Sequence, residues 1–148
     1  MTAHKDLPLT STVVFRLGTL GTLATARMTD GLDEHELKPK HVGLMSVLES
    51  GAATSQLEVA QLMGVAPSLV VALADHLQQR GLITRIRDDT DRRRQNLALT
   101  DRGRDVFAAC TAIANRLDAA LTADLTPAQL RGLADALRSL AHSNGLPS

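Results

Sequence analysis

The chain has 148 residues, a length that fits one domain with a buried core, and its 44% apolar content is too high for a disordered protein. No apolar run approaches the roughly 20 residues of a membrane span, and no export signal opens the chain, so we expect a cytoplasmic protein without membrane contact. A single cysteine excludes an internal disulfide, and two Phe without Trp or Tyr exclude the aromatic platform of single-strand binders.

The net charge of zero hides a gradient along the chain. Residues 80–104 hold eight arginines against four aspartates, whereas acidic residues outnumber basic ones before and after this segment. The Debye length is about 8 Å at physiological salt, so distant acids are screened and the local patch governs attraction to a polyanion. The middle of the chain is therefore predicted to form a basic surface.

Two helices are predicted in the first third of the chain. Apolar residues recur at helical spacing over 10–29. The acidic stretch 30–36, DGLDEHE, indicates a connection. Pro39 favours the start of a second helix, which ends near Gly51.

A helix-turn-helix unit follows. Ser55 and Glu58 have the spacing of a capping box at the start of a third helix. Gly64 permits the sharp left-handed turn of a short connection, and Pro67 opens a fourth helix that Gly81 closes. Two helices joined by such a short turn are typical of the helix-turn-helix motif.

A β-hairpin and two further helices complete the predicted elements. Residues 82–86 alternate and are rich in β-branched side chains, and 97–99 supply a short partner strand across the arginine-bearing tip 88–96. Thr100 is expected to cap a fifth helix that ends near Leu121, and the segment Thr126–Gln129 to cap a sixth.

Helix, turn, helix and basic hairpin is the order of a winged helix-turn-helix. In such a module the second helix enters the major groove of DNA, and its first residues reach base edges. The arginine-rich tip then lies beside the neighbouring backbone or minor groove. We expect Asp91 to pair with an arginine and to hold the tip in shape before DNA binds.

The segment 64–103, GVAPSLVVALADHLQQRGLITRIRDDTDRRRQNLALTDRG, resembles the MarR family of bacterial transcription regulators. GLITR, DRR and LALTDRG at the family's spacing carry the resemblance, which extends over nearly the whole chain. It implies a mostly α (α+β) fold: a single domain, 1–148, with a winged helix-turn-helix lobe at 38–100. It also implies a homodimer, a repressor of a pseudo-palindromic duplex, whose dimerisation helices are 10–31 and 101–143.

The resemblance also assigns DNA-contacting residues. Ser68 is similar to the family's DNA-contacting serine, and Asp91 and Arg92 match its wing-tip pair. Arg93 and Arg94 extend that tip.

The recognition helix departs from the family pattern. Leu69, Val71 and Ala72 are apolar where the family often has polar or basic residues. Two alternatives follow: apolar contact with thymine methyls, or specificity that rests on Ser68, His76, the wing and DNA shape. The residues expected at the DNA are Ser68, Leu69, Val71, Ala72, His76, Arg85, Arg87, Asp91, Arg92, Arg93 and Arg94.

Small phenolic or other aromatic effectors of the family lodge between the dimer helices and the DNA-binding lobe. By that resemblance, Arg16, His41 and Met45 are expected near an effector pocket.

Metal and thiol sensing are disfavoured. His35 and His41 lie where metal-sensing relatives build sites, yet the predicted fifth helix contains no histidine to complete a ligand set, so surface or hinge roles are favoured. Cys110 is predicted to be a core residue, because the peroxide-sensing branch places its cysteine near the N-terminal helix. No cofactor or metal is expected.

Two other classes of function compete with DNA binding. Asp75 and His76 are adjacent, so they point about 100° apart on a helix and form no catalytic pair, and an enzyme is not expected. The stronger alternative is a dimeric adaptor protein of the same fold that has lost specific DNA binding. A true binder loses duplex affinity steeply as salt rises, whereas an adaptor retains no duplex even at low salt.

Overall fold

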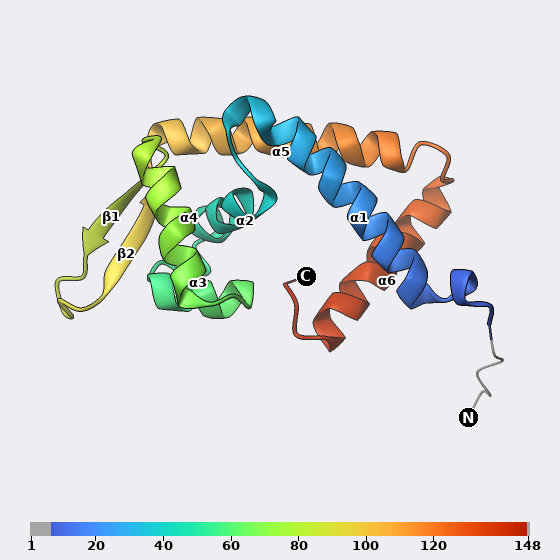
Figure 1. Cartoon of the computed structure of the whole chain (residues 1–148), viewed down its shortest axis with the longest axis horizontal. Helices are drawn as coiled ribbons and strands as arrows, with labels where there is room; N and C mark the ends of the chain where they lie inside the picture. The colour runs from blue at the N-terminus through green and yellow to red at the C-terminus, as the bar shows by residue number, and fades with distance from the viewer. Residues whose placement is uncertain (1–6, 148) are drawn as a thin grey trace.

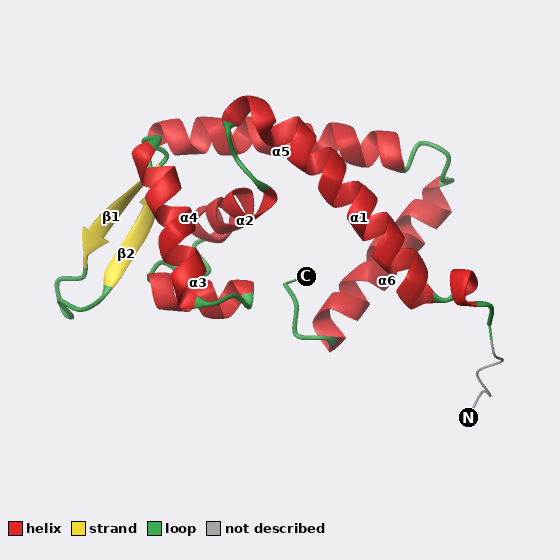
Figure 2. Cartoon of the chain, viewed as in Figure 1, coloured by secondary structure: helices red, strands yellow, loops and turns green. Residues whose placement is uncertain are grey.

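The computed structural model describes residues 7–147, which form helices and one two-stranded hairpin (Figure 1 and Figure 2). The outer ends of the expected domain, residues 1–6 and 148, lie outside the described residues. The elements are η1 (Leu9–Ser11), α1 (Val13–Leu32), η2 (Asp33–His35), α2 (Pro39–Ser50), α3 (Gln56–Met63), α4 (Pro67–Gln79), β1 (Ile83–Arg87), β2 (Gln95–Leu99), α5 (Asp101–Leu121) and α6 (Pro127–Ser143). The predicted mostly α fold with a two-stranded wing is confirmed.

Local signals build the helix-turn-helix as predicted. The Ser55 hydroxyl accepts a hydrogen bond from the Glu58 amide at 3.2 Å, and the Glu58 carboxylate accepts one from the Ser55 amide at 3.4 Å. Gly64 ends α3 at a φ of 65°, a left-handed conformation that costs glycine little. The chain then bends by 113° into α4, whose first residue is Pro67.

The hairpin pairs Ile83 with Leu99 and Arg87 with Gln95 in an antiparallel register. Its second strand begins two residues earlier than the predicted 97–99. The Leu97 amide also donates to the Thr54 carbonyl at 2.7 Å, which joins β2 to the start of α3. The wing is therefore fixed to the helix-turn-helix through its backbone.

One apolar core unites α2, α3, α4 and the hairpin with α5 and the end of α1. Its buried side chains include Leu37, Leu44, Met45, Val59, Val70, Leu73, Leu77, Leu82, Ile83, Leu97, Leu99, Cys110 and Ile113. The core position of Cys110 is confirmed, and burial raises the pKa of its thiol.

The connection predicted at 30–36 begins later than expected, because α1 continues to Leu32. Leu32 is completely buried, and a Cβ on Gly31 would lie only 2.8 Å from the Ile113 side chain. Packing against α5 thus carries the helix through a glycine that the sequence alone marks as a break. At its other end α1 begins at Val13 rather than near residue 10, because Thr12 caps it.

Figure 1 shows the hairpin, α2, α3 and α4 gathered at one end of α5, with α1 and α6 toward the other end. Helix α6 has no buried residue, and large apolar side chains of both terminal helices are exposed. They are Val13, Val14, Phe15, Leu17, Leu20 and Leu23 of α1 and Leu130, Leu133, Leu137 and Leu140 of α6.

In residues 7–147 no single helix combines the length and apolar composition of a membrane crossing, and only the bent pair of α3 and α4 passes by length and composition.

Candidate nucleic-acid interface

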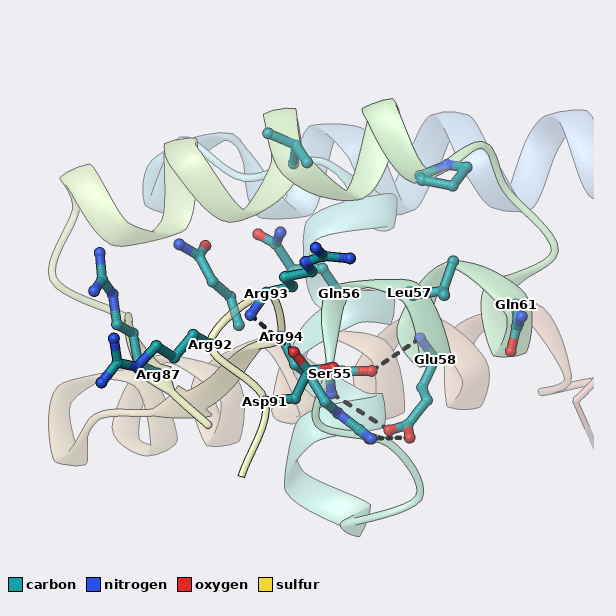
Figure 3. Close-up of a pocket in the computed structure, with 13 residues that line it drawn as sticks. Ser55, Gln56, Leu57, Glu58, Gln61, Arg87, Asp91, Arg92, Arg93 and Arg94 are labelled. Atoms are coloured by element: carbon teal, nitrogen blue, oxygen red, sulfur yellow. Dashed lines mark hydrogen bonds and ion pairs between the residues drawn. The ribbon is translucent and has the colours of Figure 1, made fainter. Parts of the chain in front are cut away.

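One face of α4 is exposed to solvent. Its residues recur at helical spacing, at Ser68, Val71, Ala72 and Asp75, while the opposite face packs into the core. This face borders an open groove of about 570 Å³ between α3, the start of α4 and the wing (Figure 3). The groove is lined by Ser55, Gln56, Leu57, Glu58, Gln61, Pro67, Val71, Arg87, Asp91, Arg92, Arg93, Arg94 and Gln95.

Two residues predicted for base contact lie away from this face. Leu69 is partly buried and packs against the core. His76 lies about two helical turns further along the same edge of α4. Its Nε2 is 2.8 Å from the Glu36 carbonyl oxygen. Both side chains are partly buried on this edge of α4, and their contact with bases stays a prediction.

His76 anchors the second half of α4. Its ring stacks on that of His41, with ring centroids 4.4 Å apart and planes 25° from parallel. Arg80 forms an ion pair with the Glu36 carboxylate next to this stack. Glu36 itself has a φ of 53°, which is uncommon for a residue with a side chain. These contacts join α4 to the segment between η2 and α2.

Arg85, which is predicted to contact DNA, donates hydrogen bonds from its guanidinium to other side chains of the protein. The group donates to the Asp75 carboxylate at 2.6 Å and also to Gln78, both of α4. Its Nε donates to the Gln56 side chain of α3 at 3.2 Å. Since the Arg85 side chain is only 18% exposed, it holds the base of the wing against both helices.

The wing tip is held in one shape, although not by the predicted partner. Asp91 accepts a hydrogen bond from the Arg93 amide at 3.0 Å instead of pairing with a guanidinium. Asp88 accepts hydrogen bonds from the hydroxyl and the amide of Thr90 at 2.6 and 2.9 Å. These bonds lower the pKa of Asp88 to about 2, and the bond from the hydroxyl has the larger effect. Both aspartates therefore stabilise the turn by hydrogen bonding to it.

Arg94 connects the wing tip to α3 through an ion pair. It forms ion pairs with Glu58 and, at 3.7 Å, with Asp88. The backbone amides of Ser55 and Thr54 lower the pKa of Glu58, and Arg94 adds to this effect. Sequence reasoning assigned Glu58 only to the capping box, and nothing in its local pattern points to a partner 36 residues away.

Three arginines of the wing are available for contact with a partner. Arg87, Arg92 and Arg93 are exposed and form no ion pair with any described residue. Figure 3 shows their side chains apart from the contact between Arg94 and Glu58. A rigid hairpin that presents free guanidinium groups beside an exposed helix face is suited to phosphate contact.

The residues expected at an effector pocket are not brought together. Met45 is completely buried in the core, and Arg16 is exposed near the start of α1, where it donates to the Thr10 carbonyl at 3.3 Å. His41 is buried and its Nδ1 accepts from the Lys38 amide at 2.8 Å. Burial, with smaller effects from His76 and Lys38, lowers the pKa of His41 to about 4.

A different hollow lies between α1 and α5. Its volume is about 220 Å³, and it is lined by Ala24, Arg27, Met28, Ala114, Leu117, Asp118 and Leu121. Within the part of the chain that the structure describes, no group of three or more His, Cys, Asp or Glu side chains is placed to hold a metal ion.

Comparison with known proteins gives concordant matches. A sequence profile of the MarR family matches residues 35–94, which include the helix-turn-helix and the wing tip. The HTH-type transcriptional repressor MdtR of Bacillus subtilis is 33% identical over 76 residues. That alignment covers 51% of this chain and 49% of MdtR, so the match spans about half the length of this relative.

Solved structures match over a longer range. A MarR family transcriptional regulator from Rhodococcus sp. RHA1 has a TM-score of 0.83 and 25% identity, with 92% of this chain and 96% of that chain covered. The transcriptional repressor CouR bound to a 23-mer DNA duplex has a TM-score of 0.81 and 26% identity, with 93% and 99% covered. CouR from Rhodococcus jostii RHA1 bound to p-coumaroyl-CoA has a TM-score of 0.78 and 26% identity, with 92% and 96% covered.

Proposed function

The chain belongs to the MarR family of transcriptional regulators, and from that premise we propose that it is a cytoplasmic repressor that binds a pseudo-palindromic duplex as a homodimer. The lobe 38–100 grips DNA, and the helices 10–31 and 101–143 join the subunits. The observation that carries this proposal is the wing: Arg87, Arg92 and Arg93 form no ion pair within residues 7–147, whereas Arg85 and Arg94 hold the hairpin against the helix-turn-helix. The structure of CouR with a DNA duplex supports it, as does the repressor name of MdtR.

In this arrangement α4 enters the major groove and the wing follows the phosphate backbone. The two copies of α4 in a dimer meet successive major grooves about 34 Å apart, one turn of duplex. Because the wing is already fixed by ion pairs and turn hydrogen bonds, little order has to be gained when DNA binds.

The first test removes two free arginines. Arg92→Ala with Arg93→Ala is expected to weaken binding to every duplex by roughly tenfold, because phosphate contacts carry no sequence information. The dependence of log affinity on log salt should become shallower by about one for each phosphate that the variant no longer binds. Fluorescence anisotropy of labelled duplexes over a salt series measures both quantities.

A matched control removes the same charge elsewhere. Arg131→Ala with Arg138→Ala changes two arginines of α6 and should leave the salt dependence as it is. Equal affinity and equal slope in the wing variant and this control would show that the wing does not contact DNA. Absence of retained duplex for the unmodified protein, even at low salt, would favour the adaptor alternative.

The exposed apolar stripe of α6 supports the homodimer. Leu130, Leu133, Leu137 and Leu140 lie on one face of a helix without a buried residue, and each is at least 40% exposed. The apolar residues of α1 are exposed as well, and exposed apolar patches of this kind mark contacts between proteins.

A charge placed on that stripe should separate the subunits. Leu133→Glu with Leu137→Glu would bury unpaired carboxylates in the interface, so the molecular mass measured by light scattering is expected to fall by half at micromolar concentration. Gly132→Glu with Ser139→Glu adds the same charge to the opposite face of α6 and should preserve the dimer. A persistent dimer in the first variant would contradict the role of this stripe.

The proposal extends to release by a small aromatic effector. CouR has been captured with p-coumaroyl-CoA, which supports an aromatic effector in this structural group. Such a ligand weakens DNA binding only if it favours a spacing of the two lobes that does not fit successive grooves. Duplex affinity measured with and without phenolic acids and their thioesters tests this extension. Identical affinities would contradict release by these effectors.

A further inference from the structure

The polar side chains around the centre of α4 are already engaged within the protein. Asp75 accepts from Arg85 at 2.6 Å, and Gln78 and Gln56 accept from the same guanidinium. His76 points to the Glu36 carbonyl. These contacts engage the Gln78 and Gln56 amide oxygens, one Asp75 carboxylate oxygen and one His76 ring nitrogen, and each contact helps to fix the wing or the helix.

The remaining surface near the start of α4 is apolar. Val71 is 40% exposed and lines the groove together with Pro67, which lacks an amide donor. Leu57 of α3 is 58% exposed and borders the same groove (Figure 3). Ser68 adds a single short hydroxyl without a side-chain hydrogen bond to any described residue. The side chains of Val71, Pro67 and Leu57 cannot supply the paired donors or acceptors with which proteins read guanine or adenine.

Thymine offers the apolar group that such a face can recognise. In the major groove the C5 methyl of thymine is the one apolar feature on the base edges, and small aliphatic side chains contact it. The free arginines lie on the rim of the same groove, so phosphate binding would bring the base edges toward Val71.

We propose that Val71 reads a thymine C5 methyl group in each half of the operator, and that this apolar contact supplies base specificity near the start of the recognition helix. The inference rests on the proposed DNA-binding function and names the base chemistry that this function recognises. Each half-site then contains a thymine whose methyl group, and not its hydrogen-bonding edge, is required.

The test exploits a change of one methyl group in DNA. Duplexes retained by the protein are first selected from random sequence, and each thymine of the selected consensus is then replaced singly by deoxyuridine. Base pairing and hydrogen-bonding groups stay the same, so the replacement removes the methyl group alone. At one thymine in each half-site we expect about fourfold weaker binding, the value of one buried methyl-sized group.

Val71→Ala identifies the protein side of the contact. This variant should bind the thymine duplex several-fold more weakly and should no longer distinguish thymine from deoxyuridine at that position. Since Val71 is substantially exposed, the variant is expected to fold, which its urea midpoint checks. Leu62→Ala shortens a half-exposed side chain of α3 that does not line the groove, and it should keep the preference for thymine.

The outcomes separate the two proposals. If the protein selects a duplex but tolerates deoxyuridine at every position, or if Val71→Ala keeps the full preference for thymine, the methyl contact is wrong and DNA binding stands. If no duplex is retained at any salt concentration, the proposed function fails and this inference fails with it.

Discussion

Replacing Gly103 with alanine is expected to lower the free energy of unfolding by about 3 kcal/mol or more, the upper range for overpacking a buried site. Gly103 lies buried in the first turn of α5, and a Cβ there would stand 2.0 Å from the Leu82 carbonyl oxygen. That oxygen cannot move away without breaking the hydrogen bond that it accepts from the Thr100 amide at 3.0 Å. Urea unfolding at fixed protein concentration measures the change, since the stability of a dimer depends on concentration.

A second glycine gives the matched control. Gly132 lies within α6, where an added Cβ meets nothing within 4 Å. Gly132→Ala should therefore leave stability unchanged or raise it by about 0.5–1 kcal/mol through helix propensity. If Gly103→Ala had the same free energy of unfolding as this control, the close approach of α5 to Leu82, just before β1, would not constrain the fold.

The same junction gives a physical meaning to two of the motifs in the sequence. Gly81 turns the chain at a φ of 71°, and its carbonyl accepts the Thr100 hydroxyl at 2.7 Å. That hydroxyl also accepts the Gly103 amide at 2.9 Å as the cap of α5. GLITR and LALTDRG are therefore the two sides of one contact, in which the strand entry, the helix cap and a glycine without a side chain fit together.

The helix-turn-helix and the wing were predictable because their signals are local. A capping box at Ser55, a glycine at position 64 and a proline at position 67 act within a few residues of the structure that they specify. The end of α1 was not, since Gly31 packs closely against Ile113 of α5, which is far away in sequence.

The roles of individual polar side chains were harder to foresee. The sequence predicted correctly that acids hold the wing in shape, but it proposed an ion pair for Asp91 where the structure has a hydrogen bond to backbone. Arg85 and His76 are predicted at DNA from their residue types, and their contacts within the protein were not foreseen. Their partners Asp75 and Glu36 are 10 and 40 residues away, and no periodic pattern encodes such pairs.

Acidification is expected to destabilise the protein through His41. The pKa of this buried imidazole is about 4 in the folded chain against 6.5 as its ordinary value, so the unfolded chain binds the proton more readily. Stability from the neutral ring is then fully present above pH 6.5 and is lost as the pH falls toward 4, by about 3 kcal/mol. Urea unfolding at a series of pH values through this window measures the loss.

His41→Asn should flatten that dependence, because asparagine can accept the Lys38 amide at the helix start without titrating. His142→Asn alters an exposed histidine at the end of α6 and should retain it. Asp88 does not interfere, since its pKa is lowered to about 2 and its contribution is lost only as the pH falls below its ordinary value of 3.8. Because the His41 ring stacks on His76, its protonation places a charge against the contact that anchors α4, so duplex affinity should depend on the same ionisation. An unchanged pH dependence of stability in His41→Asn would assign the acid sensitivity to other groups.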